Sequence, residues 1–112
     1  MSELYEKIYA EVCKIPEGSV ATYAQIAGRL GNRGLARVVG NALHVNPYPG
    51  IVPCHRVVNS RGELSGAFAF GSYDEQKRRL EEEGVEVINF RVDLNEFGVT
   101  KWLENGLKIV QN

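Results

Sequence analysis

Residues 22–44 read TYAQIAGRLGNRGLARVVGNALH, and this stretch decides the fold. Thr22 and Gln25 have the spacing of a capping box, in which two side chains satisfy the exposed N–H groups at the start of a helix. We therefore expect a short helix that begins after Thr22 and continues to Leu30.

A second helix is expected after a tight turn. Gly31 stands where helices commonly end on a left-handed residue, and Asn32 is a residue type that begins helices well. The second helix is predicted over about residues 33–45, because Pro47 disfavours a longer one. Two short helices joined by a tight glycine turn are typical of a helix-turn-helix.

The second helix has two faces of different chemistry. Helical spacing places four apolar side chains on one face, namely Leu35, Val39, Ala42 and Leu43. It places four polar side chains on another, namely Arg33, Arg37, Asn41 and His44. Gly40 lies mid-helix, where glycine costs about 1 kcal/mol relative to alanine. Either a packed neighbour or a closely approaching nucleic-acid groove would explain it.

Two more helices are predicted around this pair. Apolar residues at helical spacing predict a first helix over residues 3–14, with acids in its first turn. Ser72 and Glu75 form a second capping box, which predicts a helix that continues to Glu83 and ends at Gly84.

The remaining segments predict a small β part. Residues 57–64 are expected to form a small hairpin, or wing, and residues 85–94 a short strand or two. A terminal helix is expected around residues 99–107. The expected fold is mainly α with a small β part, a single winged helix-turn-helix domain over residues 1–112.

The composition fits one modest domain and favours no partner by total charge. The chain has 112 residues, 44% hydrophobic and 24% charged, and a formal net charge of −1. No apolar run approaches the ~18 residues that cross a bilayer, and the N-terminus lacks a signal-peptide core. We therefore expect a cytoplasmic protein without a membrane partner.

Charge is unevenly distributed along the chain. Residues 18–62 contain no aspartate, glutamate or lysine. The cations of this block are Arg29, Arg33, Arg37, Arg56 and Arg61. Because the planar guanidinium suits phosphates and base edges, the block predicts an anion-binding face, with an ordinary solvated face as the alternative.

The residues that can carry chemistry are Pro-Cys-His-Arg at positions 53–56. The thiolate is the nucleophilic form of cysteine, and a free thiol with a pKa of ~8.5 is mostly protonated at neutral pH. Cys54 beside His55 therefore indicates an activated thiol, whereas Cys13 is expected to be a buried, inert side chain. Two cysteines and two histidines at these spacings match no zinc site, so no metal is expected.

Three segments in this order resemble a known family: ARVVGNA at residues 36–42, NP at residues 46–47 and PCHRVV at residues 53–58. The stretch from about 20 to 84 resembles the 6-O-alkylguanine-DNA alkyltransferases. The resemblance implies a winged helix-turn-helix that binds duplex DNA and flips an alkylated guanine into a pocket. It implies no cofactor and a monomer.

The resemblance assigns catalytic roles to three residues. Cys54 would accept the alkyl group from the guanine oxygen, irreversibly, so that each molecule acts once. His55 would act as a base through a water, with Glu83 behind it.

The resemblance also assigns residues to DNA and to the flipped base. Arg37 would fill the gap that the flipped base leaves, and Tyr23 would press on the target phosphate and could donate to the guanine ring. Asn46 would hold the turn that supports the cysteine.

The remaining DNA-binding predictions concern the second helix and the cysteine segment. Gly40 would allow close approach of this helix to the minor groove, and Asn41 lies on its polar face. Arg56, in the cysteine segment, is the last of the predicted DNA-binding residues.

Some features are similar to the alkyltransferase-like proteins instead. Only about 18 residues precede the helix-turn-helix, and residues 66–71, GAFAFG, replace the family's usual Gly-Tyr-Ala-Gly-Gly. Proteins of that group bind alkylated guanine and flag it for nucleotide excision repair without removing the group, and they typically lack the cysteine. The alternative function is therefore a non-enzymatic lesion sensor with nucleotide excision repair proteins as partners.

Two further hypotheses come from other classes of protein. A winged-helix transcription regulator predicts binding to a specific operator, indifference to alkylated guanine, and usually a dimer. A small thiol enzyme unrelated to DNA would leave the block of arginines unexplained.

Overall fold

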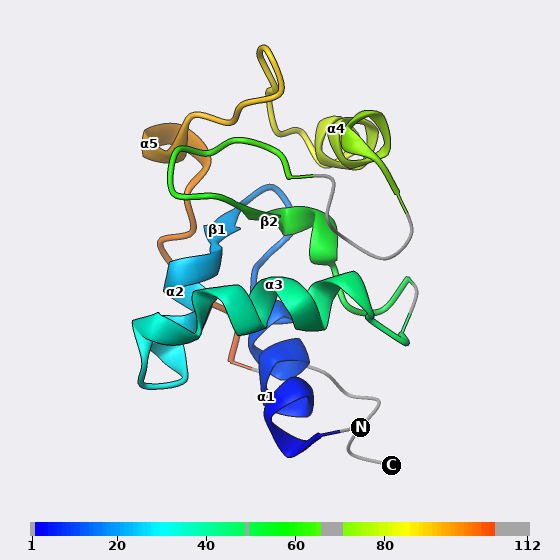
Figure 1. Ribbon diagram of the computed structural model, residues 1–112. Coiled ribbons are helices and arrows are strands. Elements are labelled where there is room, and N and C mark those ends of the chain that lie inside the picture. The colour runs from blue at the N-terminus through cyan, green and yellow to red at the C-terminus, as the bar shows by residue number, and fades with distance from the viewer. Residues whose placement is uncertain (1, 49, 66–70, 105–112) are drawn as a thin grey trace.

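The structure is a computed structural model that describes residues 2–48, 50–65 and 71–104. Figure 1 shows helices α1 and α3 towards one end, α4 and α5 at the other, and a small sheet between them. The elements in chain order are α1 (Glu3–Val12), β1 (Ala21–Thr22), α2 (Tyr23–Arg29), the 3₁₀ helix η1 (Arg33–Leu35), α3 (Ala36–His44), the 3₁₀ helix η2 (Cys54–Arg56), β2 (Val57–Val58), α4 (Tyr73–Glu82) and α5 (Leu94–Phe97).

The predicted helix-turn-helix is present as α2 and α3. The N–H of Gln25 donates to the Thr22 hydroxyl, and the Gln25 side chain accepts from the N–H of Thr22, so the capping box is confirmed. Gly31 has a φ of +93°, the left-handed conformation expected after α2. The second helix differs from expectation in its first turn, which is the 3₁₀ helix η1, capped by Asn32.

A first hydrophobic core lies under the helix-turn-helix. α1, α2 and α3 pack together, and the buried side chains that they share include Ile8, Val12, Ile26, Val39 and Leu43. The hydroxyl of the buried Tyr9 donates to the carbonyl of Ala42 near the end of α3, at 2.7 Å. This core fixes the direction of α3, which carries the predicted DNA-binding face.

The small sheet joins this core to the rest of the chain. β1 pairs with β2 in parallel, with Ala21 opposite Val57 and Thr22 opposite Val58. The expected hairpin over residues 57–64 is therefore only partly correct, because β2 takes its ladder partner from β1. The turn after β2 does form, with the N–H of Asn59 donating to the carbonyl of Glu63.

A second core lies between α4 and the segment that follows it. Its buried members are Val20, Val58, Leu64, Leu80, Val85, Val87 and Val92. α4 begins at its predicted Ser72 cap, and Gly84 after it has a φ of +86°. Residues 85–94 form single bridges rather than the expected strands.

The C-terminal segment differs from the prediction. α5 follows an Asp93 cap that the sequence reasoning missed, and residues 99–104 of the predicted terminal helix are not helical. Residues 105–107 of that prediction lie outside the described residues. Within the described ranges, no helix has the length and apolarity that a membrane span needs.

Candidate active site and nucleic-acid interface

Cys54 begins the 3₁₀ helix η2 and is 5% exposed. The side-chain amide of the buried Asn46 donates to Cys54 Sγ at 3.2 Å. Asn46 is itself oriented, because its oxygen accepts from the N–H of Tyr48 at 2.9 Å. The structure therefore brings the predicted nucleophile and the predicted supporting asparagine into contact.

The Cys54 thiol is held in its protonated form by its surroundings. Burial raises the pKa of the Cys54 thiol to about 12, although the hydrogen bond from Asn46 and the charge of Arg79 both act to lower the pKa. A nucleophilic thiolate at this position therefore needs a base that takes the proton during the reaction.

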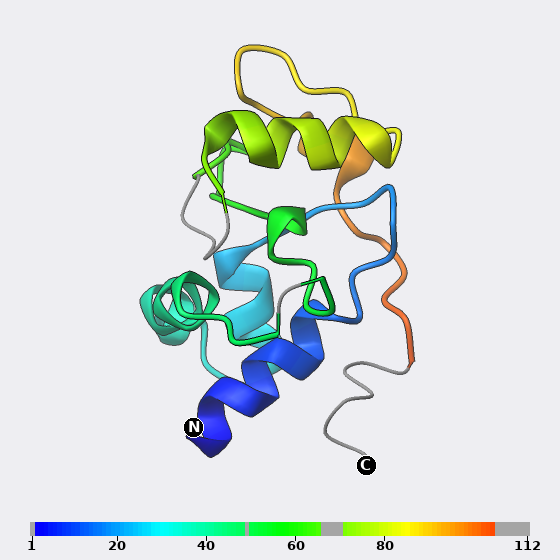
Figure 2. The same ribbon diagram turned by 90° about the vertical axis from the view of Figure 1, so that its right-hand side faces the viewer.

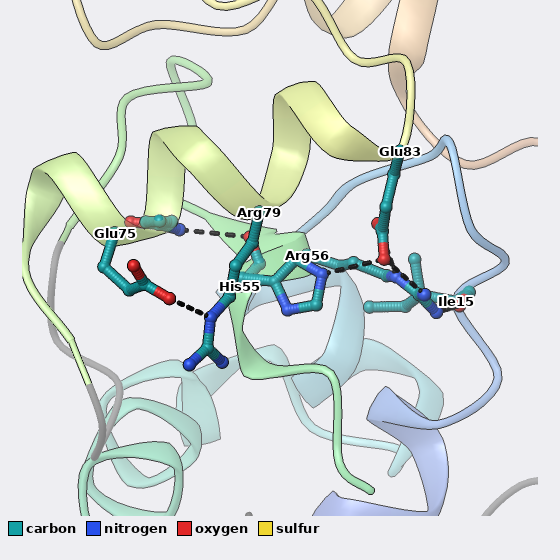
Figure 3. Close-up of polar contacts among 7 residues, drawn as sticks. Ile15, His55, Arg56, Glu75, Arg79 and Glu83 are labelled. Atoms are coloured by element: carbon teal, nitrogen blue, oxygen red, sulfur yellow. Dashed lines mark hydrogen bonds and ion pairs between the residues drawn. The ribbon is translucent and has the colours of Figure 1, made fainter. Parts of the chain in front are cut away.

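His55, Arg56 and Glu83 form one largely buried polar cluster, whose side chains are 12–14% exposed and which is shown in Figure 3. His55 Nε2 lies 3.0 Å from Glu83 Oε2. Arg56 binds the same carboxylate with two N–H groups, at 2.9 and 2.7 Å, and a third donates to the carbonyl of Ile15. The predicted base and the glutamate behind it are thus adjacent, although 28 positions separate them in sequence.

The cluster fixes the protonation of His55. Burial lowers the pKa of His55, and the charges of Arg56 and Arg79 act in the same direction against Glu83, so the ring is neutral at neutral pH. Because an ionised carboxylate only accepts, the hydrogen bond to Glu83 assigns the proton to Nε2. Nδ1 is then the basic nitrogen.

Arg56 has a different position from the one expected for a DNA contact. Its side chain is 14% exposed and forms a two-pronged ion pair with Glu83, rather than lying on the α3 face. Its hydrogen bonds also lower the pKa of Glu83, which burial alone would raise. Its geometry is that of a residue that holds Glu83 in place beside His55.

The five arginines of the acid-free block do not form one face. Arg29 pairs with Glu11 and lies over the Trp102 ring at 4.2 Å, and Arg56 pairs with Glu83. Both of these acidic partners come from outside the block, which the sequence pattern did not reveal. Arg33 and Arg37 are exposed on η1 and α3.

Gln76 is a site residue that the sequence reasoning missed. It lies on α4, is fully buried, and its amide donates to the carbonyls of His55 and Val57 at 3.2 and 3.1 Å. Its oxygen accepts from the N–H of Ser65 at 3.2 Å. Gln76 therefore connects α4 to the backbone of the cysteine segment and to the segment before residue 66. A glutamine among charged residues gives no local signal for this role.

Tyr23 lies near both Cys54 and Gly40 of α3. Its hydroxyl shares a hydrogen bond of 2.5 Å with the Ser65 hydroxyl, and burial raises the pKa of Tyr23. A Cβ placed on Gly40 would lie 3.8 Å from the Tyr23 ring, which is ordinary contact. Packing inside the protein therefore does not require glycine at position 40.

The predicted DNA-binding residues of α3 lie together on the surface. A shallow hollow of about 490 Å³ is lined by Tyr23, Ala36, Arg37, Gly40, Asn41 and His44. Arg37, Asn41 and His44 are exposed. The face therefore combines a cation, small residues and an edge of Tyr23, as close approach to a nucleic-acid backbone requires.

Two further expectations concern the altered loop at residues 66–71 and the absence of a metal site. Residues 66–70 of the altered GAFAFG loop are not among the described residues. In the described ranges, no three histidine, cysteine, aspartate or glutamate side chains are grouped as a metal ion would need.

Comparison with known proteins agrees with this geometry. The sequence pattern of the family described as "6-O-methylguanine DNA methyltransferase, DNA binding domain" matches residues 3–85. Alkyltransferase-like protein 1 of Schizosaccharomyces pombe is 46% identical over 98 residues, which cover 87% of this chain and 88% of the relative.

A methyltransferase and a solved complex with DNA also match. A methylated-DNA–protein-cysteine methyltransferase of Methanothermobacter thermautotrophicus is 40% identical over 84 residues, or 75% of this chain and 46% of the relative, so the chain spans less than half of it. The S. pombe alkyltransferase-like protein in complex with damaged DNA containing O6-carboxymethylguanine has a TM-score of 0.78 at 42% identity, covering 89% of this chain and 97% of that one. The chain therefore belongs to the 6-O-methylguanine DNA methyltransferase family, through its DNA-binding domain.

Proposed function

We propose that this protein binds duplex DNA containing 6-O-alkylguanine, turns the damaged base out of the helix and accepts its alkyl group on Cys54. The observation that carries the proposal is the contact of Asn46 with Cys54 Sγ, next to a neutral His55 that is paired with Glu83. A thiol, an orienting donor and a base are the parts that an alkyl transfer to sulfur needs.

The proposed transfer exchanges one alkyl group for one proton. Cys54 Sγ bonds to the alkyl carbon as the bond from that carbon to guanine O6 breaks, and the electron pair of the broken bond stays on the guanine. The thiol proton passes through a water to Nδ1 of His55, a proton from solvent restores the guanine ring, and His55 then releases its extra proton to solvent, so that the thiol proton is in effect exchanged for the alkyl group. Tyr23, whose pKa is raised by burial, stays protonated and can donate to the base. The thioether is stable, so each molecule reacts once.

DNA binding is assigned to the α3 face. Arg37 is exposed beside the hollow in front of Tyr23, where it can occupy the space that an everted base leaves in the stack. Extrusion costs a few kcal/mol and less at a mispaired lesion, so lesion pairing itself contributes selectivity. This face, with few groups for reading base edges, fits binding that tolerates many sequences.

Mass measurement tests the transfer directly. The protein is incubated with a duplex containing 6-O-methylguanine, and its mass should rise by about 14 Da, one methylene, because a methyl group replaces one proton. Cys54→Ser should remove the gain, whereas Cys13→Ser should retain it, because Cys13 belongs to α1's end rather than to the cluster. A mass gain on Cys13 would contradict the proposal.

A second candidate function is a lesion sensor that binds 6-O-alkylguanine and recruits nucleotide excision repair proteins. The pKa of about 12 of the Cys54 thiol favours it, and so does the nearly full-length match to an alkyltransferase-like protein. Tight binding to the lesion duplex with no change in mass would support the sensor. Family membership argues against the transcription regulator and the unrelated thiol enzyme.

A further inference from the structure

The turn that leads from Asn46 to Cys54 is organised around Tyr48. The N–H of Tyr48 donates to Asn46 Oδ1 at 2.9 Å. The carbonyl of Tyr48 accepts from the N–H groups of Ile51 and Val52, at 3.2 and 3.3 Å, and the carbonyl of Val52 accepts from the N–H of Cys54 at 2.8 Å. The side chain that contacts the sulfur and the backbone that carries the sulfur therefore both depend on the position of Tyr48.

Tyr48 is itself held by α1. Its hydroxyl donates to Glu6 Oε1 at 2.8 Å, across 42 positions of sequence. Its ring packs edge-on against the fully buried Tyr9, with 5.7 Å between the ring centroids. The hydrogen bond to Glu6 is the main reason that the pKa of Tyr48 is raised, so the hydroxyl remains a donor at neutral pH. One polar and one apolar contact thus fix the Tyr48 side chain.

Glu6 contacts Tyr48 with one carboxylate oxygen and leaves the other without a partner. Glu6 Oε2 is buried and accepts no hydrogen bond within the described part of the chain. A buried carboxylate oxygen of this kind destabilises the folded state. An apolar side chain at position 6 would avoid that loss, so the packing of α1 does not by itself explain a glutamate there.

The hydrogen bonds around Asn46 decide which end of its amide faces the sulfur. Because its oxygen accepts from the N–H of Tyr48, its nitrogen faces Cys54 Sγ, at 3.2 Å. A donor there stabilises the thiolate, and the hydrogen bond from Asn46 acts to lower the pKa of the Cys54 thiol against the effect of burial. If the amide were turned round, its oxygen would oppose ionisation of the thiol instead.

Resting on the proposed function, we propose that Glu6 and Tyr48 are positioning residues for the alkyl transfer. The hydrogen bond between them holds the turn that keeps the amide nitrogen of Asn46 on Cys54 Sγ. Neither side chain acts on the alkyl group itself, and both act through Asn46. Their loss therefore slows the ionisation of the thiol.

The rate of mass gain on Cys54, measured in a single turnover with a saturating 6-O-methylguanine duplex, tests this role. Tyr48→Phe removes the hydroxyl and keeps the ring, and it should slow the transfer about tenfold, as the loss of one hydrogen bond that favours a charged group would. Glu6→Met should slow it equally. Glu6→Gln should retain most of the rate, because its amide oxygen can still accept from Tyr48.

Tyr5→Phe is the matched control, because the Tyr5 ring packs against the same Tyr9 ring, at 6.3 Å, but takes no part in the hydrogen bonds that lead to Asn46. It should react at the wild-type rate. A rate in Tyr48→Phe equal to that of the control would overturn the proposal.

The double variant Tyr48→Phe with Glu6→Met separates positioning from stability. Tyr48→Phe alone leaves the Glu6 carboxylate buried without a donor, whereas replacing both partners by apolar groups is nearly neutral for folding. The double variant should therefore recover wild-type stability in urea and still transfer slowly. If the transfer rate recovers together with the stability, the pair is only structural and the proposal is overturned.

Labelling of Cys54 by iodoacetamide, followed by the mass of its peptide between pH 7 and 9, needs no DNA. The double variant should label about tenfold more slowly at each pH, because a smaller fraction of the thiol is ionised. Unchanged labelling would overturn the proposal, as would faster labelling, which would mean that looser packing exposes a thiol that is 5% exposed in the wild type. If the wild type gained no mass from the lesion duplex, the proposed function would fail, and the labelling rates would still decide the positioning role.

Discussion

The α3 face and the cluster of His55, Arg56 and Glu83 hold their polar groups in opposite ways. On α3, Arg37, Asn41 and His44 are exposed to solvent. In the cluster, Glu83 is engaged by three hydrogen bonds and is 13% exposed. Figure 2 shows α3 apart from α4, with the green segment that contains η2 between them. The difference implies that changes on α3 alter recognition with little effect on folding, whereas changes in the cluster affect the folded state itself.

The largest expected effect is on stability, from a change in the cluster of His55, Arg56 and Glu83. Arg56→Met should destabilise the fold by about 3–5 kcal/mol, because it leaves the carboxylate of Glu83 buried without its main cation. Urea unfolding measures the loss. Arg61→Met, at an exposed position, should change stability by no more than about 0.5 kcal/mol.

The Arg56→Met variant also distinguishes the two roles considered for Arg56, namely contact with DNA and support of Glu83. If Arg56 acts through Glu83, then Arg56→Met at low temperature, where it remains folded, should bind undamaged duplex as the wild type does. A loss of duplex affinity without a loss of stability would return Arg56 to the DNA-binding face.

On the exposed side, Arg37→Ala should leave the free energy of unfolding within about 0.5 kcal/mol of the wild type. It should reduce the affinity for a 6-O-methylguanine duplex about tenfold more than the affinity for the undamaged duplex, because Arg37 fills the stack only when a base is turned out. Fluorescence anisotropy with both duplexes measures this ratio.

Arg33→Ala is the matched comparison, because Arg33 is exposed on the adjacent 3₁₀ helix. Arg33→Ala should weaken binding to both duplexes to the same extent, as the loss of a phosphate contact does. If Arg37→Ala lost equal affinity for both duplexes, Arg37 would instead be a contact to the DNA phosphate backbone.

Gly40→Ala sharpens the comparison within α3 itself. The added methyl group meets the Tyr23 ring at ordinary contact distance, so the variant should be more stable by about 1 kcal/mol, the helix propensity difference. Its affinity for duplex DNA should fall, because the methyl group keeps the groove away from the helix. A variant that gains stability and binds DNA as tightly as the wild type would show that the groove does not approach Gly40 closely.

Sequence reasoning succeeded where the signal is local. The capping boxes at Thr22 and Ser72 and the glycines at 31 and 84 specify helix ends within a few residues, so α2 and α4 were predictable. The polar face of α3 is likewise a matter of helical spacing.

Sequence reasoning failed where segments that are distant in the chain come into contact. Nothing in the sequence pairs Arg56 with Glu83, 27 positions later, or β1 with β2, so Arg56 was expected on DNA and β2 in a hairpin. Gln76 resembles an exposed helix residue until tertiary contacts bury it. His55 and Glu83 were linked only through the family resemblance, since their contact depends on how α4 packs on η2.

The smallest expected effect is the pH dependence that the buried cluster adds to folding. The folded-state pKa of His55 lies below its usual 6.5, so the unfolded chain binds more protons as the pH falls. The stability that neutral His55 contributes is complete above about pH 6.5 and is lost as the pH falls towards the folded-state pKa. Glu83 adds a second loss of stability that begins near pH 4.5.

Unfolding in urea at pH 7.5, 6.5 and 5.5 should therefore show a smaller fall in stability for His55→Gln than for the wild type. His44→Gln, on the exposed α3 face, should fall as the wild type does, and a parallel fall in all three proteins would contradict a neutral, buried His55.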